Sequence, residues 1–150
     1  MIAQSVPKRS HGVPQQAAAI AIRRNGRSLE VCLIRRRESK TWGIPKGFVD
    51  AGDTHRTTAL NEAWEEAGLR GRLLGRPIGT YEYKKWKSRF AVLVYVMEVL
   101  EQKDKWDEMD FRDRRWVSFR KATELLTKHP VHPLLDRANK RVVRKRQRKA

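Results

Sequence analysis

The sequence lacks the features that would mark a disulfide scaffold, a membrane protein or a secreted chain. Its one cysteine, Cys32, has no partner for an internal disulfide and cannot form a cysteine metal site alone, so we expect a core residue. The longest apolar run, residues 90–97, has the length of a strand, whereas a membrane-spanning helix needs about 18 apolar residues. No apolar segment follows Lys8 and Arg9, so no secretory signal is expected. These absences favour a cytoplasmic protein that does not enter a membrane.

Acidic residues are also scarce relative to basic ones. Lys and Arg number 34 against 17 Asp and Glu, which gives a net charge of +17 over 150 residues. Residues 140–149 hold seven cations and no acid, and smaller groups lie at residues 35–37 and 84–89. A surplus of this size favours a polyanionic partner, although a solvated surface is the simpler interpretation of any single cluster. Composition alone does not choose between a phosphorylated small molecule and a nucleic acid.

The length and the hydrophobic pattern predict one α+β domain, as a monomer or a homodimer. Three parts are expected: a flexible N-terminal arm at residues 1–16, the domain at 17–139 and a basic tail at 140–150. Within the domain, Asn25-Gly26 between two apolar runs predicts a β-hairpin. Further expected elements are strands at residues 73–74, 78–83, 90–100 and 115–119, a helix starting at Ser118 or Thr123, and a helix at about 134–143 with a frayed basic end.

The segment at residues 54–67 is the most informative one. It predicts a helix that Gly68 ends, with Glu62, Glu65 and Glu66 on one face. Like charges at this spacing each destabilise a helix by roughly a few tenths of a kcal/mol, and no Lys or Arg within residues 57–69 relieves them. The residues themselves leave open a solvated acidic face or a site for a hard divalent cation, Mg²⁺ or Mn²⁺.

Residues 47–69, GFVDAGDTHRTTALNEAWEEAGL, resemble the Nudix box. The positions that match its spacing are Gly47, Glu62, Ala63, Glu65, Glu66, Gly68 and Leu69. Asp53 stands where the family has glutamate, and Asn61 stands where it has arginine. Since the family's pair is thought to brace the loop against the helix, a shorter Asp–Asn pair is expected to affect loop geometry and turnover more than metal binding.

The resemblance extends beyond the box, because the order of elements over residues 17–135 is similar to the Nudix α/β/α sandwich with its mixed sheet. Within that superfamily the chain resembles diphosphoinositol polyphosphate phosphohydrolases and diadenosine polyphosphate hydrolases. The features that carry this likeness are the cations at 35–37 before Trp42, the Trp-x-x-Pro-x-Gly segment, the basic stretch at 84–89 and Arg114-Arg115-Trp116. Gln15-Gln16 replaces the basic residues that this group tends to carry before its first strand.

The resemblance implies an enzyme that uses Mg²⁺, or Mn²⁺, to cleave a P–O–P bridge with water. It implies metal ligands at Glu62, Glu65, Glu66 and the backbone carbonyl of Lys46. Glu65 is the first choice for the catalytic base, and the alternatives are Glu62, Asp107 and Glu108.

Substrate phosphates need cations, and the candidates are Arg35, Arg36, Arg37, Lys84, Lys87, Arg89 and Arg112. The candidates for stacking on a nucleobase are Trp42, Tyr83 and Trp86, whereas Trp64, Trp106 and Trp116 are expected to pack. His55, His129 and His132 are expected to have no catalytic role.

Three functions remain open at this point. The first is a pyrophosphohydrolase that acts on a diphosphoinositol polyphosphate or a dinucleoside polyphosphate. The second is a pyrophosphohydrolase of RNA 5′ ends, with the basic tail along the phosphate backbone. The third is a catalytically weak Nudix-like module that binds a nucleotide or nucleic acid.

Overall fold

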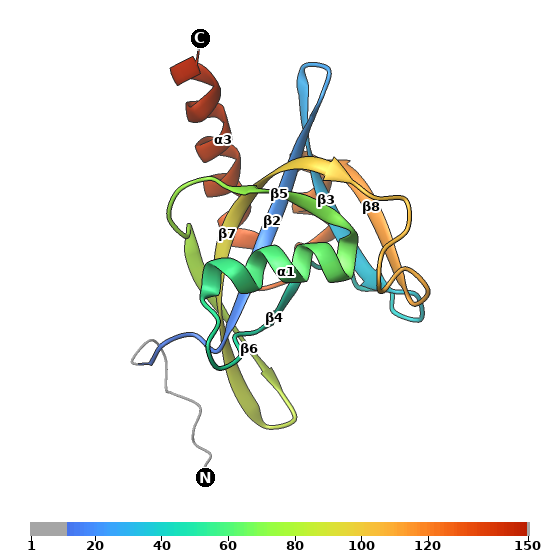
Figure 1. Ribbon diagram of the computed structural model, residues 1–150, viewed down its shortest axis with the longest axis vertical. Helices are drawn as coiled ribbons and strands as arrows, with labels where there is room; N and C mark the ends of the chain where they lie inside the picture. The colour runs from blue at the N-terminus through green and yellow to red at the C-terminus, as the bar shows by residue number, and fades with distance from the viewer. Residues whose placement is uncertain (1–11, 150) are drawn as a thin grey trace.

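The computed structural model describes residues 12–149, which form an α+β fold with helices on both faces of a mixed sheet (Figure 1). In chain order the elements are β2 (Gln16–Asn25), β3 (Ser28–Arg36), β4 (Lys46–Phe48), α1 (His55–Ala67), β5 (Leu69–Leu73), β6 (Gly79–Lys85), β7 (Ser88–Gln102), β8 (Arg112–Ser118), α2 (Phe119–Leu125), the 3₁₀ turn η2 (His132–Leu134) and α3 (Leu135–Lys149). The sheet order is β5-β7-β2-β3-β8, with β4 paired to β2 and β6 to β7. The predicted fold class and the hairpin at Asn25-Gly26 are confirmed.

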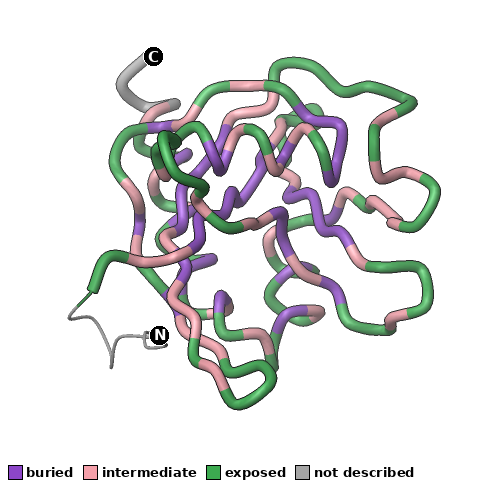
Figure 2. Tube along the Cα trace, turned by 60° about the horizontal axis from the view of Figure 1, so that its bottom comes forward, coloured by how far each residue is buried: buried purple, intermediate pink, exposed green. Residues whose placement is uncertain are grey.

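Strand β2 is the centre of the domain, and its buried run from Gln16 to Ile22 contacts both layers (Figure 2). Ala17, Ala19 and Ala21 face the cluster that contains α1, whereas Ala18, Ile20 and Ile22 face the cluster beneath α2 and α3. This alternation follows from the two-residue period of a strand. Alanines on both β2 and α1 leave little side-chain volume between them, so the helix lies close to the sheet.

One edge of β2 is shared by two partners. Its first residues pair with β4, and its residues from Ile22 onward pair with β3. Because β3 and β4 take different parts of the same edge, the chain between them turns back after β3. Its end lies between β3 and β2, where Gly43 bridges Ile34 and the Pro45 carbonyl accepts the Ala19 N–H. This split in the sheet positions the site described below.

Helix α1 begins and ends where its sequence predicts. The Thr54 hydroxyl accepts a hydrogen bond from the Thr57 N–H at 3.1 Å, and the Thr57 hydroxyl accepts one from the Thr54 N–H at 3.1 Å. Gly68 has φ 66°, the left-handed conformation that closes a helix with least strain in glycine. The register of Glu62, Glu65 and Glu66 on α1 is therefore fixed at both ends.

The last helix is longer than predicted, because α3 continues through Lys149 where a frayed end was expected. Val142 is buried, and the Arg141 guanidinium donates to the carbonyls of Leu74 and Arg76, both at 2.7 Å. The boundary predicted at residue 140 therefore coincides with no break in the structure. Of the predicted arm at 1–16, residues 1–11 lie outside the described residues and Gln16 already belongs to β2. Among the described helices, none is long and apolar enough to cross a membrane.

Candidate active site

Glu62 and Glu66 lie one helical turn apart on α1 and face β4. A Cβ atom added at Gly47 would lie 2.4 Å from the Glu62 carboxyl carbon, so glycine lets the carboxylate keep this position against the strand. The glycine and the first glutamate of the motif, 15 residues apart in sequence, are thus in direct contact. Their spacing follows from the packing of β4 on α1.

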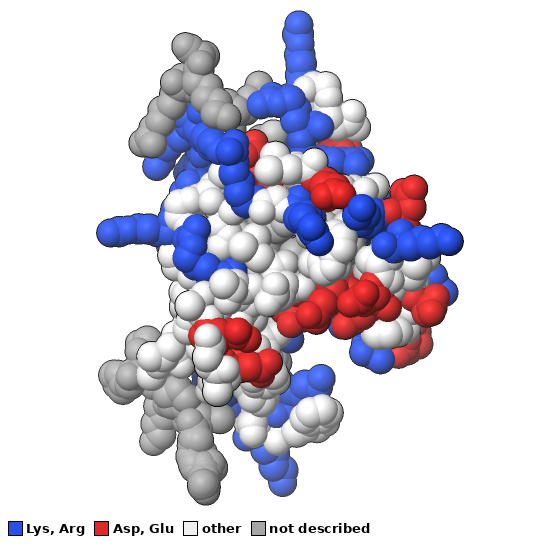
Figure 3. Space-filling model, in the orientation of Figure 1, with Lys and Arg blue, Asp and Glu red and all other residues white. Residues whose placement is uncertain are grey.

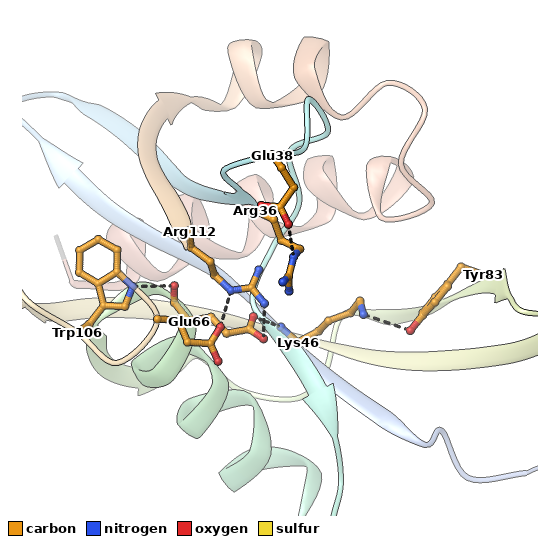
Figure 4. Close-up of polar contacts among 8 residues, drawn as sticks. Arg36, Glu38, Lys46, Glu66, Tyr83, Trp106 and Arg112 are labelled. Carbon is orange, nitrogen blue, oxygen red and sulfur yellow. Dashed lines mark hydrogen bonds and ion pairs between the residues drawn. The ribbon is translucent and has the colours of Figure 1, made fainter. Parts of the chain in front are cut away.

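Glu66 is the buried member of the pair, with 8% of its surface exposed. Its Oε1 accepts the Lys46 N–H at 3.1 Å, and its Oε2 pairs with the Arg112 guanidinium at 3.4 Å (Figure 4). The backbone carbonyl of Glu66 accepts the Trp106 indole N–H at 3.0 Å. Arg112 also pairs with Glu108, at 2.5 Å. Arg112, predicted to bind substrate, is therefore already the counter-ion of two acids.

The backbone of Lys46 faces the same carboxylates. Lys46 is opposite Ala18 in the β2–β4 ladder, and the neighbouring Ala19 N–H donates to the Pro45 carbonyl at 3.1 Å. In an antiparallel ladder these hydrogen-bonded positions alternate, and both polar groups of one residue point to the same side. The Lys46 carbonyl therefore points away from β2 and toward α1, as its N–H does.

Burial raises the pKa of Glu66 to about 8, with the Glu62 charge adding to the rise and Arg112 opposing it. Burial also raises the pKa of Glu62, to which Glu65 and Glu108 contribute by repulsion. Burial and the Glu62 charge thus both favour the uncharged form of Glu66, which keeps a proton to higher pH than an ordinary glutamate. Two desolvated carboxylates beside an inward-facing carbonyl are an oxygen donor set that suits Mg²⁺ or Mn²⁺ in place of that proton.

The two carboxylates and the Lys46 carbonyl do not complete the coordination of a divalent cation by themselves. Within residues 12–149, no three His, Cys, Asp or Glu side chains converge closely enough to hold a metal ion by themselves. Glu65 is exposed, and its nearest recorded contact is backbone, the Glu108 N–H donating to its carbonyl at 3.2 Å. The pair can therefore hold Mg²⁺ only together with other oxygens, and substrate phosphate and water commonly supply them.

A pocket of about 370 Å³ opens beside Glu66. Its wall includes Arg35, Arg36 and Arg112 from the predicted phosphate-binding set. It also includes Lys85, which belongs to the basic stretch at 84–89 but was not a named candidate, and His129, which was expected to have no catalytic role. The remaining predicted cations, Arg37, Lys84, Lys87 and Arg89, are not among the described residues that line it. Figure 3 shows acidic side chains in a band beside α1 with basic side chains around them.

A model of the NUDIX domain matches residues 13–138 of the chain. The chain belongs to the NUDIX family. It is 31% identical over 107 residues to the Arabidopsis thaliana protein named Nudix hydrolase 13, mitochondrial, covering 65% of this chain and 53% of that protein. It is also 31% identical to human diphosphoinositol polyphosphate phosphohydrolase 3-alpha, covering 81% of this chain and 74% of that protein. The chain thus spans about half the length of the plant relatives it matches.

Solved NUDIX structures have the same fold. A C. elegans Ap4A hydrolase, in a binary complex, superimposes with a TM-score of 0.76 at 18% identity and covers 87% of this chain and 98% of that one. The NUDIX domain of Shewanella oneidensis NrtR, in complex with ADP ribose, superimposes with a TM-score of 0.64 at 17% identity, over 85% and 86%. At these identities the likeness establishes the fold alone.

The two departures from the Nudix box do not form a substitute pair. Asp53 and Asn61 are both exposed, and among the described residues their side chains make no hydrogen bond to each other. Both side chains are shorter than the glutamate and arginine they replace, which accounts for the missing contact. The hydrogen bonds between Thr54 and Thr57 hold the start of the helix instead.

The tryptophans that were expected to pack do so, whereas Trp42, a candidate for stacking on a nucleobase, is an exception. Trp64, Trp106 and Trp116 each lie against an arginine guanidinium, and Trp86 is 84% exposed at the turn between β6 and β7. Trp42 is buried, with the Arg35 guanidinium 4.3 Å from its ring centroid. Trp42 is thus a support for a pocket arginine, and Trp86, although exposed, has the Lys85 ammonium 4.5 Å from its ring centroid.

Proposed function

We propose that this NUDIX protein is a pyrophosphohydrolase that needs Mg²⁺, or Mn²⁺, and cleaves a P–O–P bond in a highly phosphorylated small molecule. The observation that carries the proposal is the buried Glu62–Glu66 pair at the edge of a pocket walled by arginine and lysine. The carboxylates of α1 carry negative charge that is costly to bury, and the arginines and lysines of the pocket carry positive charges that repel one another. A divalent cation with bound phosphate would relieve both.

The residues of the chain have separate roles in this proposal. A bound cation would supply positive charge that neutralises phosphate oxygens and makes a nearby water more acidic. Glu62, Glu66 and the Lys46 carbonyl would be its ligands, and the Lys46 N–H and Arg112 orient the Glu66 carboxyl. Glu65 accepts the proton of the attacking water as the bridging P–O bond breaks, since its exposed carboxylate lies on the same helix face.

The class of substrate follows from the number of cations. Arg35 and Arg36 line the pocket together with Lys85, and Lys84, Lys87 and Arg89 continue the positive charge along the β6–β7 hairpin. Several cations favour several phosphates. The names of the relatives agree with this class, since they include diphosphoinositol polyphosphate phosphohydrolases and an Ap4A hydrolase. We therefore propose a diphosphoinositol polyphosphate or a dinucleoside polyphosphate as substrate.

A hydrolysis screen with matched variants tests this function. Inositol pyrophosphates, dinucleoside polyphosphates, nucleoside triphosphates and 5′-triphosphorylated RNA are incubated with Mg²⁺ and with EDTA, and released phosphate products are measured. The substitution Glu66→Gln is expected to reduce kcat by at least about 100-fold on the best substrate. Glu124→Gln on α2 removes an equally charged but exposed carboxylate and is the control.

Two outcomes would contradict the proposal. One is hydrolysis that persists in EDTA, and the other is a Glu66→Gln variant with unchanged kcat. Activity on RNA alone would support the second function, the RNA 5′-end pyrophosphohydrolase. Metal-dependent binding of a nucleotide without turnover by any variant would support the binding module.

A further inference from the structure

His129 lies in the wall of the pocket although it is outside every motif of the sequence. It follows α2, where its N–H donates to the Leu126 carbonyl at 2.9 Å and its carbonyl accepts the His132 N–H at 3.0 Å. The backbone is therefore fixed on both sides of the residue. The side chain is half-buried and is one of the groups that border the pocket.

The tautomer of His129 follows from its contact with the chain. Its Nδ1 accepts the backbone N–H of Val131 at 3.0 Å, so Nδ1 carries no proton. The ring is therefore neutral and its proton is on Nε2. This arrangement excludes an imidazolium and also a general base at Nε2.

The Nε2 side of the ring faces Gly43, which also lines the pocket, and a Cβ atom added to Gly43 would be 3.6 Å from Nε2. The Tyr81 ring packs edge-on against the imidazole, with centroids 5.4 Å apart and the planes at 73°, so the ring is held in place. Among the described residues Nε2 makes no hydrogen bond, and only the Tyr81 hydroxyl is both fully buried and unpaired, so Nε2 is open to solvent.

An N–H group that borders a pocket and has no protein acceptor is free to donate to water or to a ligand. Among the charged side chains that share the pocket wall, Glu66 is an acid and five are cations, including Arg36, Lys46 and Lys85. An anion is therefore the acceptor that this wall would attract. Phosphate oxygens accept hydrogen bonds strongly and match both the cations and the neutral donor.

We propose that His129 is a substrate-binding residue whose Nε2–H donates to a non-bridging phosphate oxygen of the ligand in this pocket. The inference rests on the proposed function for the identity of the anion. It adds a directional donor to the cations, so it fixes the position of one phosphate rather than merely attracting charge. His129 acts by binding and takes no proton from the substrate.

Two conservative substitutions separate this role from a structural one. In His129→Asn, the amide oxygen replaces Nδ1 as acceptor for Val131, and the Nε2–H is lost. In His129→Gln, the amide nitrogen reaches the position of Nε2, and the acceptor for Val131 is lost. His132→Asn is the matched control, because His132 is nearby on η2 and does not border the pocket.

The probe is methylenediphosphonate, a diphosphate analogue that water cannot cleave, titrated calorimetrically in Mg²⁺ into each variant. We expect His129→Asn to raise Kd about tenfold, and His129→Gln and His132→Asn to stay within about threefold of the parent chain. Thermal unfolding is recorded for each variant, and the expected loss of stability is larger for the Gln variant than for the Asn variant. The tenfold rise in Kd with a stable Asn variant is the supporting result.

The inference is overturned if the Asn variant binds as the parent does, or if the Gln variant weakens binding as much as the Asn variant. It is also overturned if the parent chain does not bind the probe. Because the assay measures binding and not turnover, its result is independent of the hydrolysis screen. A chain that binds the probe through His129 but hydrolyses nothing refutes only the proposed function.

Discussion

Single residues determine how closely α1 approaches β4, and Gly47 is the clearest example. Its missing side chain gives the Glu62 carboxylate the space that a Cβ atom would take. Glu66, one turn later, is held by Lys46 and Arg112, which come from different strands. The geometry of the acid pair therefore depends on contacts made by its neighbours as well as on the glutamates.

Gly47→Ala is expected to displace the Glu62 side chain, because the new Cβ would lie 2.4 Å from its carboxyl carbon. A misplacement of about 1 Å in an active site costs on the order of 100-fold in rate, so kcat should fall about 100-fold. Gly26→Ala is the control, since Gly26 has positive φ in open space and its replacement strains only the hairpin. Steady-state kinetics and thermal unfolding of both variants check this, and an unimpaired Gly47→Ala variant would contradict it.

The raised pKa of Glu66 predicts how stability depends on pH without metal. Between pH 4.5, its ordinary pKa, and about 8, the unfolded chain loses the Glu66 proton and the folded chain keeps it. The free energy of unfolding should therefore fall as pH rises through this window and level off above it. Urea titrations in EDTA at pH 5 and pH 8 measure the fall. In Glu66→Gln the fall should be markedly smaller, and an equal fall in both proteins would contradict the assignment.

At the scale of elements, the sequence predicts those features that depend on contacts between residues close together in the chain. The periodicity, the Thr54 cap and Gly68 define α1 locally, and Asn25-Gly26 defines the first hairpin. The pairing of Arg112 with Glu66, 46 residues apart, depends on how β8 lies beside α1. The place of His129 in the pocket depends equally on tertiary packing. No short-range pattern carries that information, so the sequence alone predicts neither the Arg112–Glu66 contact nor the position of His129 in the pocket wall.

Helix α3 provides a prediction at this scale. Deletion of residues 140–150 removes the buried Val142 and both Arg141 hydrogen bonds, so the free energy of unfolding should fall by about 2 kcal/mol. Deletion of residues 146–150 leaves those contacts in place and should change it little. Urea unfolding of both truncated chains measures the difference. Equal stability of the two would show that residues 140–145 contribute nothing to the stability of the domain.

At the scale of the whole molecule, a net charge of +17 attracts any polyanion, and the fold decides which cations contact it. Arg36 borders the pocket, whereas the neighbouring Arg37 pairs with Asp113 and donates to the Met109 carbonyl. The charge surplus explains attraction at a distance, and the split between β3 and β4 explains the position of the pocket. Specific binding should therefore depend on which arginine is removed.

Arg36→Ala and Arg37→Ala each remove one positive charge and so have the same effect on net charge. Arg36→Ala should raise KM about tenfold for the substrate with most phosphates, and Arg37→Ala should stay within about threefold. Kinetics at two salt concentrations separate this local effect from general screening. Equal rises in KM for the two variants would contradict a pocket-specific role.

Manganese binding measured by electron paramagnetic resonance tests the metal site most directly. Mn²⁺ is titrated into the chain and into Glu66→Gln in the presence of methylenediphosphonate, and free Mn²⁺ is quantified from its signal. We expect the parent chain to bind Mn²⁺ tightly and the variant to bind it with a Kd at least about tenfold higher. Equal affinity in the two proteins would show that the buried carboxylates of α1 do not hold the ion.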